Sequence, residues 1–283
     1  MSEAKKREKV IFMGNGPLAE YALEELKQKC EVIFRARKKE DLEKVCELKR
    51  KNPEAHGVLA SFGVMIPRSV LEIFEPEGIL NIHPSFLPAY RGASPIESAI
   101  LAGDTEFGIS VMKLVPKMDA GPVYVQATLS EVPIEKDFLY RELAKVGARM
   151  AYMVLATDRD AEPDSIDEDK RGWLKKVLNP AVQDESKATY CGKMDKSMSL
   201  LAPETDTAEV TLRKIIAYQG YPKPKYAFFG VSCIILEAHL MEKGEKAVLE
   251  MPCADGQILA IDRLQPEGRK PMDAKSFVNG YGK

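Results

Sequence analysis

The chain has 283 residues, 45% of them apolar and 30% charged, with a formal net charge of −2. Such a chain is globular and long enough for one large domain or two ordinary ones. The balanced charge predicts no general attraction to nucleic acid. No apolar run approaches the roughly 20 residues of a membrane helix, and the charged stretch at residues 2–9 is unlike a signal peptide.

The cysteines and histidines offer no metal site. Five cysteines are scattered without a Cys-x-x-Cys pair, and their number is odd, which argues against a disulfide framework and against zinc. Only three histidines are present, and none belongs to a His/Cys cluster. We therefore predict a cytoplasmic protein without a bound metal.

The N-terminal part alternates short apolar runs with amphipathic stretches. This pattern predicts strands at 10–13, 31–35 and 57–62, and helices at 18–29, 38–51 and 68–74. Gly14 and Gly16 follow the first strand and match part of a dinucleotide-binding fingerprint. The third glycine is missing and Pro17 removes a backbone donor, so we favour a plain strand-to-helix turn over nucleotide binding.

Residues 78–92 are the most informative stretch. Side chains alternate along a strand, so Asn81 and His83 project from the same face. Pro84 ends the strand just after the histidine. An amide and an imidazole therefore lie together at the carboxyl end of a strand, where open α/β sheets have their sites. For His83 alone, a structural hydrogen bond is an equal alternative.

Asp119 lies on a predicted loop between two further strands. The loop spans 116–122 and the strands 108–115 and 123–129, with helices predicted before and after them at 94–101 and 139–155. Taken alone, Asp119 suits an Asx turn that only shapes the loop. If the two sets of strands are neighbours, its carboxylate joins Asn81 and His83.

The remainder of the chain changes character. Residues 157–172 are rich in charged residues and proline and predict a solvated connection, while 173–187 show no clear period. A helix is predicted at 207–218, capped by Thr207, and strand-like runs follow at 227–229, 232–239, 246–251 and 257–264. Several short strands around one helix indicate a small OB-like β-barrel.

Asn81, His83 and Asp119 are the candidate catalytic residues. An amide donor and an imidazole can stabilise an oxyanion, and a carboxylate can hold the imidazole or accept a proton from an attacking amine. No serine or cysteine lies in a nucleophile motif. This combination favours direct transfer between two bound substrates.

The stretch from Asn81 to Ile96 and the segment Met118–Pro122 resemble the signature of the folate-dependent formyltransferases. Further segments are similar to the branch that acts on methionyl-tRNA, namely Ser61–Pro67, Pro180–Tyr190, Leu264–Met272 and Phe277–Gly280. A Pro-containing turn at 200–206 places the domain boundary between about 187 and 206, so we predict an N-terminal domain at 1–187, a linker at 188–206 and an OB-like C-terminal domain at 207–283. The resemblance implies that the first domain is Rossmann-like, binds folate and is catalytic, and that the second binds tRNA. We expect a monomer.

The resemblance also implies the reaction. The formyl donor is expected to be 10-formyltetrahydrofolate, and the acceptor the α-amino group of methionine on initiator methionyl-tRNA. Asn81 and His83 would polarise the formyl oxygen and stabilise the oxyanion. Asp119 would help to take the proton from the amine and would orient His83.

The same resemblance places the tetrahydrofolate site against Ser85, Phe86, Leu87 and Pro88. Arg91 and Gly92 would support that turn.

The sequence departs from the family's pattern after the second strand. Members that act on tRNA usually carry a longer loop there, rich in glycine and basic residues, whereas residues 35–39 run almost directly into the next helix. Either these residues do the same work in shortened form, or recognition of the acceptor end differs. An amino sugar nucleotide is the alternative acceptor, and a non-catalytic OB-type nucleic-acid binder is the alternative class of protein.

Overall fold

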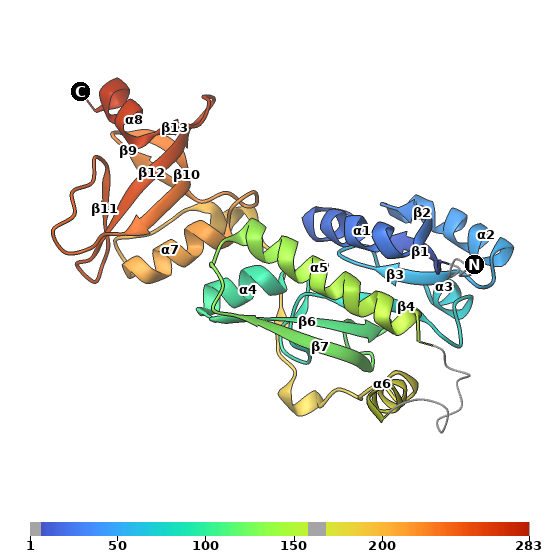
Figure 1. Cartoon of the computed structure of the whole chain (residues 1–283). Coiled ribbons are helices and arrows are strands. Elements are labelled where there is room, and N and C mark those ends of the chain that lie inside the picture. The colour runs from blue at the N-terminus through green and yellow to red at the C-terminus, as the bar shows by residue number, and fades with distance from the viewer. Residues whose placement is uncertain (1–6, 158–167, 283) are drawn as a thin grey trace, which may run out of the picture. The chain divides into compact units, whose positions relative to one another are not determined.

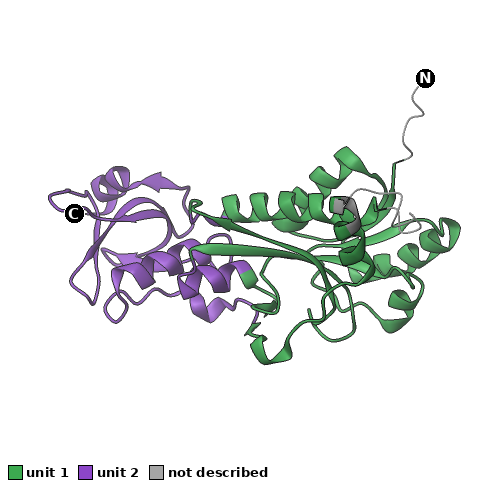
Figure 2. Cartoon of the chain, turned by 60° about the horizontal axis from the view of Figure 1, so that its bottom comes forward, with its two compact units in different colours: residues 1–95, 105–133, 137–191 green, residues 96–104, 134–136, 192–283 purple. Residues whose placement is uncertain are grey.

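The computed structural model describes residues 7–157 and 168–282 and divides the chain into two compact units (Figure 2). Unit 1 takes in residues 1–95, 105–133 and 137–191, and unit 2 residues 96–104, 134–136 and 192–283. Two short inner segments thus belong to the C-terminal unit. The finer limits expected from the sequence, with a linker at 188–206, stay a prediction. Most of the charged stretch at 2–9 and of the connection at 157–172 lies outside the described residues.

Unit 1 is built on a six-stranded sheet in the order β2-β1-β3-β4-β6-β7 (Figure 1). Its strands are β1 (Lys9–Met13), β2 (Glu31–Ala36), β3 (His56–Leu59), β4 (Ile79–His83), β6 (Glu106–Lys113) and β7 (Val123–Ser130). The first four strands are parallel, whereas β6 runs antiparallel to β4 and β7 antiparallel to β6. Because of this reversal, β6 ends beside the start of β4, and the loop that follows has to turn back to reach His83.

Helices cover both faces of this sheet. They are α1 (Pro17–Lys29), α2 (Leu42–Lys51), α3 (Arg68–Glu72) and α5 (Lys136–Leu155), with α6 (Glu168–Leu178) following the gap in the description. On one face, apolar side chains of the parallel strands pack with Val45 of α2 and Val70 of α3. On the other face, Gly147 of α5 lacks a Cβ, which lets Ile82 and Ile109 pack closely against the helix. Ile82 therefore faces α5, and its neighbours in β4 face away from it.

Unit 2 is built on a five-stranded antiparallel sheet in the order β11-β12-β10-β9, with β13 paired to β12. Its elements are α4 (Pro95–Ala102, whose first residue lies in unit 1), α7 (Ala208–Ala217), β9 (Lys225–Phe228), β10 (Val231–Leu240), β11 (Glu250–Pro252), β12 (Ile258–Pro266), β13 (Met272–Asp273) and α8 (Ala274–Tyr281). Buried side chains of the sheet and of both C-terminal helices, such as Ile235, Leu259, Ile215 and Phe277, form its core. The sheet ends at β9 and β11 and makes half of a barrel.

Most predicted strands and helices are present, with ends displaced by a few residues. Thr207 caps α7 as predicted, since its side chain accepts the Val210 N–H. Helices α6 and α8 were not predicted. Among the side chains of α6 that the structure describes, Leu174 and Val177 are buried, and α8 combines Asn279 and Gly280 with one buried aromatic residue, so neither carries a strong periodic signal. The run at 246–251 contributes only its last two residues to β11.

Candidate active site

β4 brings Asn81 and His83 to one face of the sheet. Both side chains are buried, each with 5% exposure. Asn81 lies between Leu59 of β3 and Met112 of β6, and His83 lies beside Ser110 of β6. Strand pairing therefore fixes the two polar groups on the face that turns away from α5, as the alternation of the sequence predicted.

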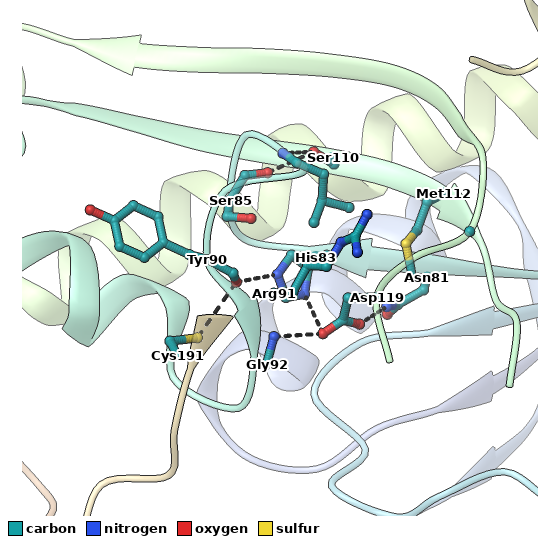
Figure 3. Close-up of polar contacts among 12 residues, drawn as sticks. Asn81, His83, Ser85, Tyr90, Arg91, Gly92, Ser110, Met112, Asp119 and Cys191 are labelled. Carbon is teal, nitrogen blue, oxygen red and sulfur yellow. Dashed lines mark hydrogen bonds and ion pairs between the residues drawn. The ribbon is translucent and has the colours of Figure 1, made fainter. Parts of the chain in front are cut away.

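The carboxylate of Asp119 lies against both of these side chains (Figure 3). Its Oδ1 accepts a hydrogen bond from Asn81 Nδ2 at 3.3 Å, and its Oδ2 lies 3.7 Å from His83 Nδ1. Asp119 has a φ of +48°, a left-handed conformation that residues other than glycine rarely adopt. The structure thus brings the three predicted catalytic residues together, with Asp119 in a backbone conformation that its surroundings must maintain.

The hydrogen bond of His83 fixes its tautomer. Nε2 lies 3.0 Å from the carbonyl oxygen of Tyr90, which can only accept, so Nε2 carries the proton and donates it to this bond. In the neutral ring Nδ1 is then unprotonated, and its lone pair faces the Asp119 carboxylate. Nδ1 is therefore the ring atom placed to take up a proton, and the resulting imidazolium would face a negative charge.

Gly92 completes the environment of Asp119. Its N–H donates to Asp119 Oδ2 at 2.8 Å. Its φ is +126°, and a Cβ at this position would collide with the carbonyl oxygen of Cys191. Only glycine fits here, because any other residue would push the backbone donor away from the carboxylate.

The four residues predicted to line a folate site differ in what they offer a ligand. Ser85 is buried and its hydroxyl donates to Ala89 O at 2.6 Å, while Leu87 packs in a small apolar cluster with neighbours from β6 and β7. Phe86 is 50% exposed and Pro88 is half-buried. Phe86 and Pro88 therefore present side-chain surface, and Ser85 and Leu87 shape the loop from within. Their role in folate binding stays a prediction.

A network behind Asp119 was not predicted from the sequence. Arg91, which is completely buried, donates from Nε and Nη2 to Gln183 Oε1 at 3.0 and 2.8 Å. Gln183 Nε2 in turn donates to the carbonyl oxygens of Asp119 at 2.8 Å and Gly121 at 2.7 Å. The sequence indicated only that Arg91 supports its own turn, whereas the guanidinium reaches a glutamine 92 positions away.

The segment 183–191 surrounds the site further. Glu185 accepts from Arg91 and from Lys117, and these hydrogen bonds lower its pKa to about 2. Burial lowers the pKa of Arg91, but its hydrogen bonds to Glu185 and Tyr190 outweigh burial and leave the pKa raised. β8 (Tyr190–Cys191) pairs with β5 (Arg91–Gly92). The only sequence signal for this role was the family-like segment Pro180–Tyr190.

The turn after β1 is occupied by the chain's own groups. The N–H groups of Gly14 and Asn15 donate to Ala36 O and Ser61 O. The Arg35 guanidinium donates to Gly14 O at 3.2 Å and to both carboxylate oxygens of Glu20 at 2.6 Å. This arrangement favours the plain strand-to-helix turn, and it leaves only residues 37–39 of the short basic segment exposed.

Comparison with protein-family models gives the family. The formyl transferase model matches residues 5–154, and the model of the formyl transferase C-terminal domain matches residues 193–282. The chain belongs to the formyl transferase family. This membership confirms the predicted family and the prediction of an enzyme that transfers a formyl group.

Individual relatives agree with this membership. A methionyl-tRNA formyltransferase of Anaplasma marginale is 31% identical over 233 residues, which cover 79% of this chain and 69% of the relative. HypX from Aquifex aeolicus, solved in complex with tetrahydrofolic acid, is similar with a TM-score of 0.68 and 16% identity over 99% of this chain, which spans only 48% of HypX. A methionyl-tRNA formyltransferase from Clostridium thermocellum has a TM-score of 0.58 and 18% identity, covering 92% of this chain and 98% of that one. The structural similarities confirm the predicted Rossmann-like fold with a smaller β unit. That β unit is a half-barrel and not a closed barrel.

Three further features of the described residues concern membranes, metals and cysteines. Within residues 7–157 and 168–282, none of the helices combines the length and the hydropathy of a membrane span. In the same parts of the chain, no three His, Cys, Asp or Glu side chains gather as a metal site requires. All five cysteines are free.

Proposed function

We propose that this enzyme transfers the formyl group of 10-formyltetrahydrofolate to the α-amino group of methionine on initiator methionyl-tRNA. The observation that carries the proposal is the contact among Asn81, His83 and Asp119 on one buried face. The names of relatives more than 30% identical support the acceptor, and the folate complex of a structure with the same fold supports the donor. A monomer in the cytoplasm is part of the same proposal.

The first step is attack of the amine nitrogen on the formyl carbon. The C=O π electrons move to the oxygen, so a tetrahedral oxyanion forms. Asn81 Nδ2 and His83, protonated at Nδ1, are the donors that would stabilise it. Both donors lie on strand β4, so they need little reorganisation as the charge develops.

The second step breaks the bond between the formyl carbon and N10 of the folate. The amine must lose a proton and N10 must gain one, so the reaction has no net proton change. Asp119 is the proposed acceptor of the amine proton. His83 Nδ1–H is the proposed donor of the proton to N10. Because Asp119 Oδ2 lies 3.7 Å from His83 Nδ1, a small movement would then allow the proton to pass from Asp119 to His83, which restores both groups.

Unit 2 is the proposed partner of the tRNA. Phosphate contacts would supply most of this binding, since they do not depend on sequence and need only exposed lysines and arginines. Exposed basic residues of unit 2 include Lys243, Lys246, Arg269, Lys270 and Lys275. Binding through such contacts would weaken steeply as salt is added.

The test is formyl transfer by the wild-type enzyme from 10-formyltetrahydrofolate to three acceptors: initiator methionyl-tRNA, elongator methionyl-tRNA and an amino sugar nucleotide. We expect product with initiator methionyl-tRNA and much less with the elongator. If product forms with the amino sugar nucleotide alone, the proposed acceptor is wrong and the proposed formyl-transfer chemistry stands. No transfer to any of them would contradict the proposal. Light scattering of the purified chain measures its molar mass and so tests whether it is a monomer.

A further inference from the structure

We propose that Gln183 is a positioning residue for the reaction, which holds the Asp119 carboxylate in place through the backbone of its loop, and that Arg91 fixes Gln183 in the required orientation. The inference rests on the role proposed above for Asp119. It assigns a function in chemistry to a residue of the segment that leads toward the C-terminal unit.

The chemistry of Arg91 settles which way the Gln183 amide points. A guanidinium only donates, so the oxygen of the amide must face Arg91. The NH₂ group then faces the two carbonyl oxygens, and both of its hydrogens are used, at 2.8 Å to Asp119 O and 2.7 Å to Gly121 O. One side chain thus joins a fully buried cation to two carbonyls of the loop at 116–122 that carries Asp119, called the catalytic loop from here on.

These two carbonyls are the ones that control the orientation of Asp119. They belong to Asp119 itself and to the residue two positions on, so the bonds fix the backbone around a φ of +48°. A left-handed conformation is unfavourable for a residue other than glycine, so the loop would relax without such restraints. The carboxylate would then move away from Asn81, Gly92 and His83.

Burial makes the restraint effective. Gln183 is 8% exposed and Arg91 is 0% exposed, so water does not compete for these hydrogen bonds. Hydrogen bonds to a charged group in such surroundings are stronger than those between neutral partners. The alternative is that Gln183 only stabilises the fold, and the experiment has to separate these two roles.

The decisive variant is Gln183→Glu. A carboxylate keeps an acceptor for Arg91 but replaces the NH₂ donor with an oxygen that faces two carbonyl oxygens, so the catalytic loop has to move. We expect kcat for formyl transfer to fall about 100-fold with KM for the folate changed by less than about threefold, as for a misplaced catalytic group. Gln219→Glu is the matched control, because Gln219 Nε2 also donates to two backbone carbonyls, those of Ile235 and Leu236 in unit 2. It should lower the melting temperature and leave kcat unchanged.

A spectroscopic readout tests the position without any acceptor. The chain has three histidines, so the ring signals of His56, His83 and His239 can be followed separately by NMR. In Gln183→Glu we expect the His83 signal to shift, because the facing carboxylate has moved, and the other two to stay. If the wild type formylates no acceptor, the proposed function fails, while this signal still decides the role of Gln183.

The outcomes are exclusive. A wild-type kcat together with an unmoved His83 signal in Gln183→Glu would overturn the proposal. If that variant does not fold, Gln183→Met, which removes the donors and also the acceptor of Arg91 but adds no repulsion at the two carbonyls, decides by the same two readouts. Failure of both variants to fold would make Gln183 a structural residue and would also overturn it.

Discussion

Arg35 and Arg91 are two nearly or fully buried arginines of the same unit, and both bind a carboxylate together with another oxygen acceptor. Arg35, whose side chain is 10% exposed, connects Gly14 O of the first turn to Glu20 of α1. Arg91, whose side chain is 0% exposed, connects Glu185 to Gln183 and through it to the loop of Asp119. The contacts of Arg35 therefore connect only parts of the fold, whereas the contacts of Arg91 lead to a candidate catalytic residue.

This difference shows how to recognise a positioning residue. Burial and the number of hydrogen bonds do not distinguish the two arginines, because both are well satisfied. What distinguishes them is the group at the far end of the network. The substitutions below test this distinction, and the largest effects are expected where the network ends on Asp119.

The largest effect is expected for Asp119→Asn. The amide keeps an acceptor for Gly92 N–H but cannot take a proton, so kcat should fall about 1000-fold, within the range for loss of a general base. Steady-state formyl transfer at saturating folate measures this. The control is Asp273→Asn, which retains a capping oxygen for Ser276 N–H in unit 2 and should leave kcat unchanged. A tenfold loss or less would contradict the role given to Asp119.

The next effect is expected for Asn81→Ala. This change removes the donor proposed for the oxyanion and also the bond to Asp119 Oδ1, so kcat should fall about 100-fold. Because the alanine leaves residues 85–88 of the predicted folate site unchanged, binding of the folate, measured by fluorescence or calorimetry, should persist. Loss of folate binding with an unchanged rate at saturation would show that Asn81 serves binding and not chemistry.

A smaller effect is expected for Arg91→Lys. A lysine cannot reach Gln183 Oε1 and both oxygens of Glu185 at once, so the network loosens without losing its charge. We expect kcat to fall about tenfold and the free energy of unfolding to fall by about 2 kcal/mol. Kinetics and urea unfolding of the same preparation measure the two quantities. Lower stability with a wild-type kcat would make Arg91 equivalent to Arg35.

Arg35→Lys provides the other side of the comparison. The lysine loses the paired contact with Glu20 or the contact with Gly14 O, and we expect unfolding free energy to fall by about 1 kcal/mol with kcat unchanged. The same variant tests whether Arg35 recognises the acceptor. A large rise in KM for methionyl-tRNA would show that the guanidinium leaves Glu20 to bind RNA.

The smallest effect, on stability alone, is expected for replacement of His239, whose ring is far more exposed than the side chains of Arg35 and Arg91. Its side chain is 45% exposed, and hydrogen bonds to Glu245 and then to Asp262 raise its pKa above the ordinary value. The stabilisation is therefore complete below about pH 6.5 and is lost as pH rises through the raised pKa of the folded state. Solvent screening limits it to about 0.5 kcal/mol. Melting temperatures of the wild type and His239→Gln should differ at pH 5.5 and converge by pH 9, and a gap that widens with pH would contradict this sign.

The local parts of the site were predictable from the sequence. Asn81 and His83 share a face because strands alternate, and Pro84 marks where the strand ends, so both facts follow from neighbouring residues. The position of Asp119 beside them could be predicted only from the family resemblance, because neither strand's sequence specifies that β4 pairs with β6. The departure at residues 35–39 was also visible, and the structure adds that Arg35 is bound to Glu20.

The remaining parts depend on contacts between distant residues. Gln183 touches the loop of Asp119 across 64 positions, and a single polar side chain has no periodicity that would reveal it. Helices α6 and α8 are short and owe their stability to a few buried side chains and, for α8, to the Asp273 cap, which a pattern of propensities detects poorly. Whether a β unit closes into a barrel depends on how its edge strands meet, which the four strand-like runs do not specify.

A double-mutant cycle between Asp119 and Gln183 tests directly whether Gln183 acts through the Asp119 carboxylate. The single-turnover rate of formyl transfer would be compared for the wild type, Asp119→Asn, Gln183→Glu and the double variant. If Gln183 acts through Asp119, the double variant should be no slower than Asp119→Asn by more than about twofold, since coupled residues are not additive. Losses that multiply in the double variant would contradict this role, because Gln183 would then act independently of the carboxylate it is proposed to hold.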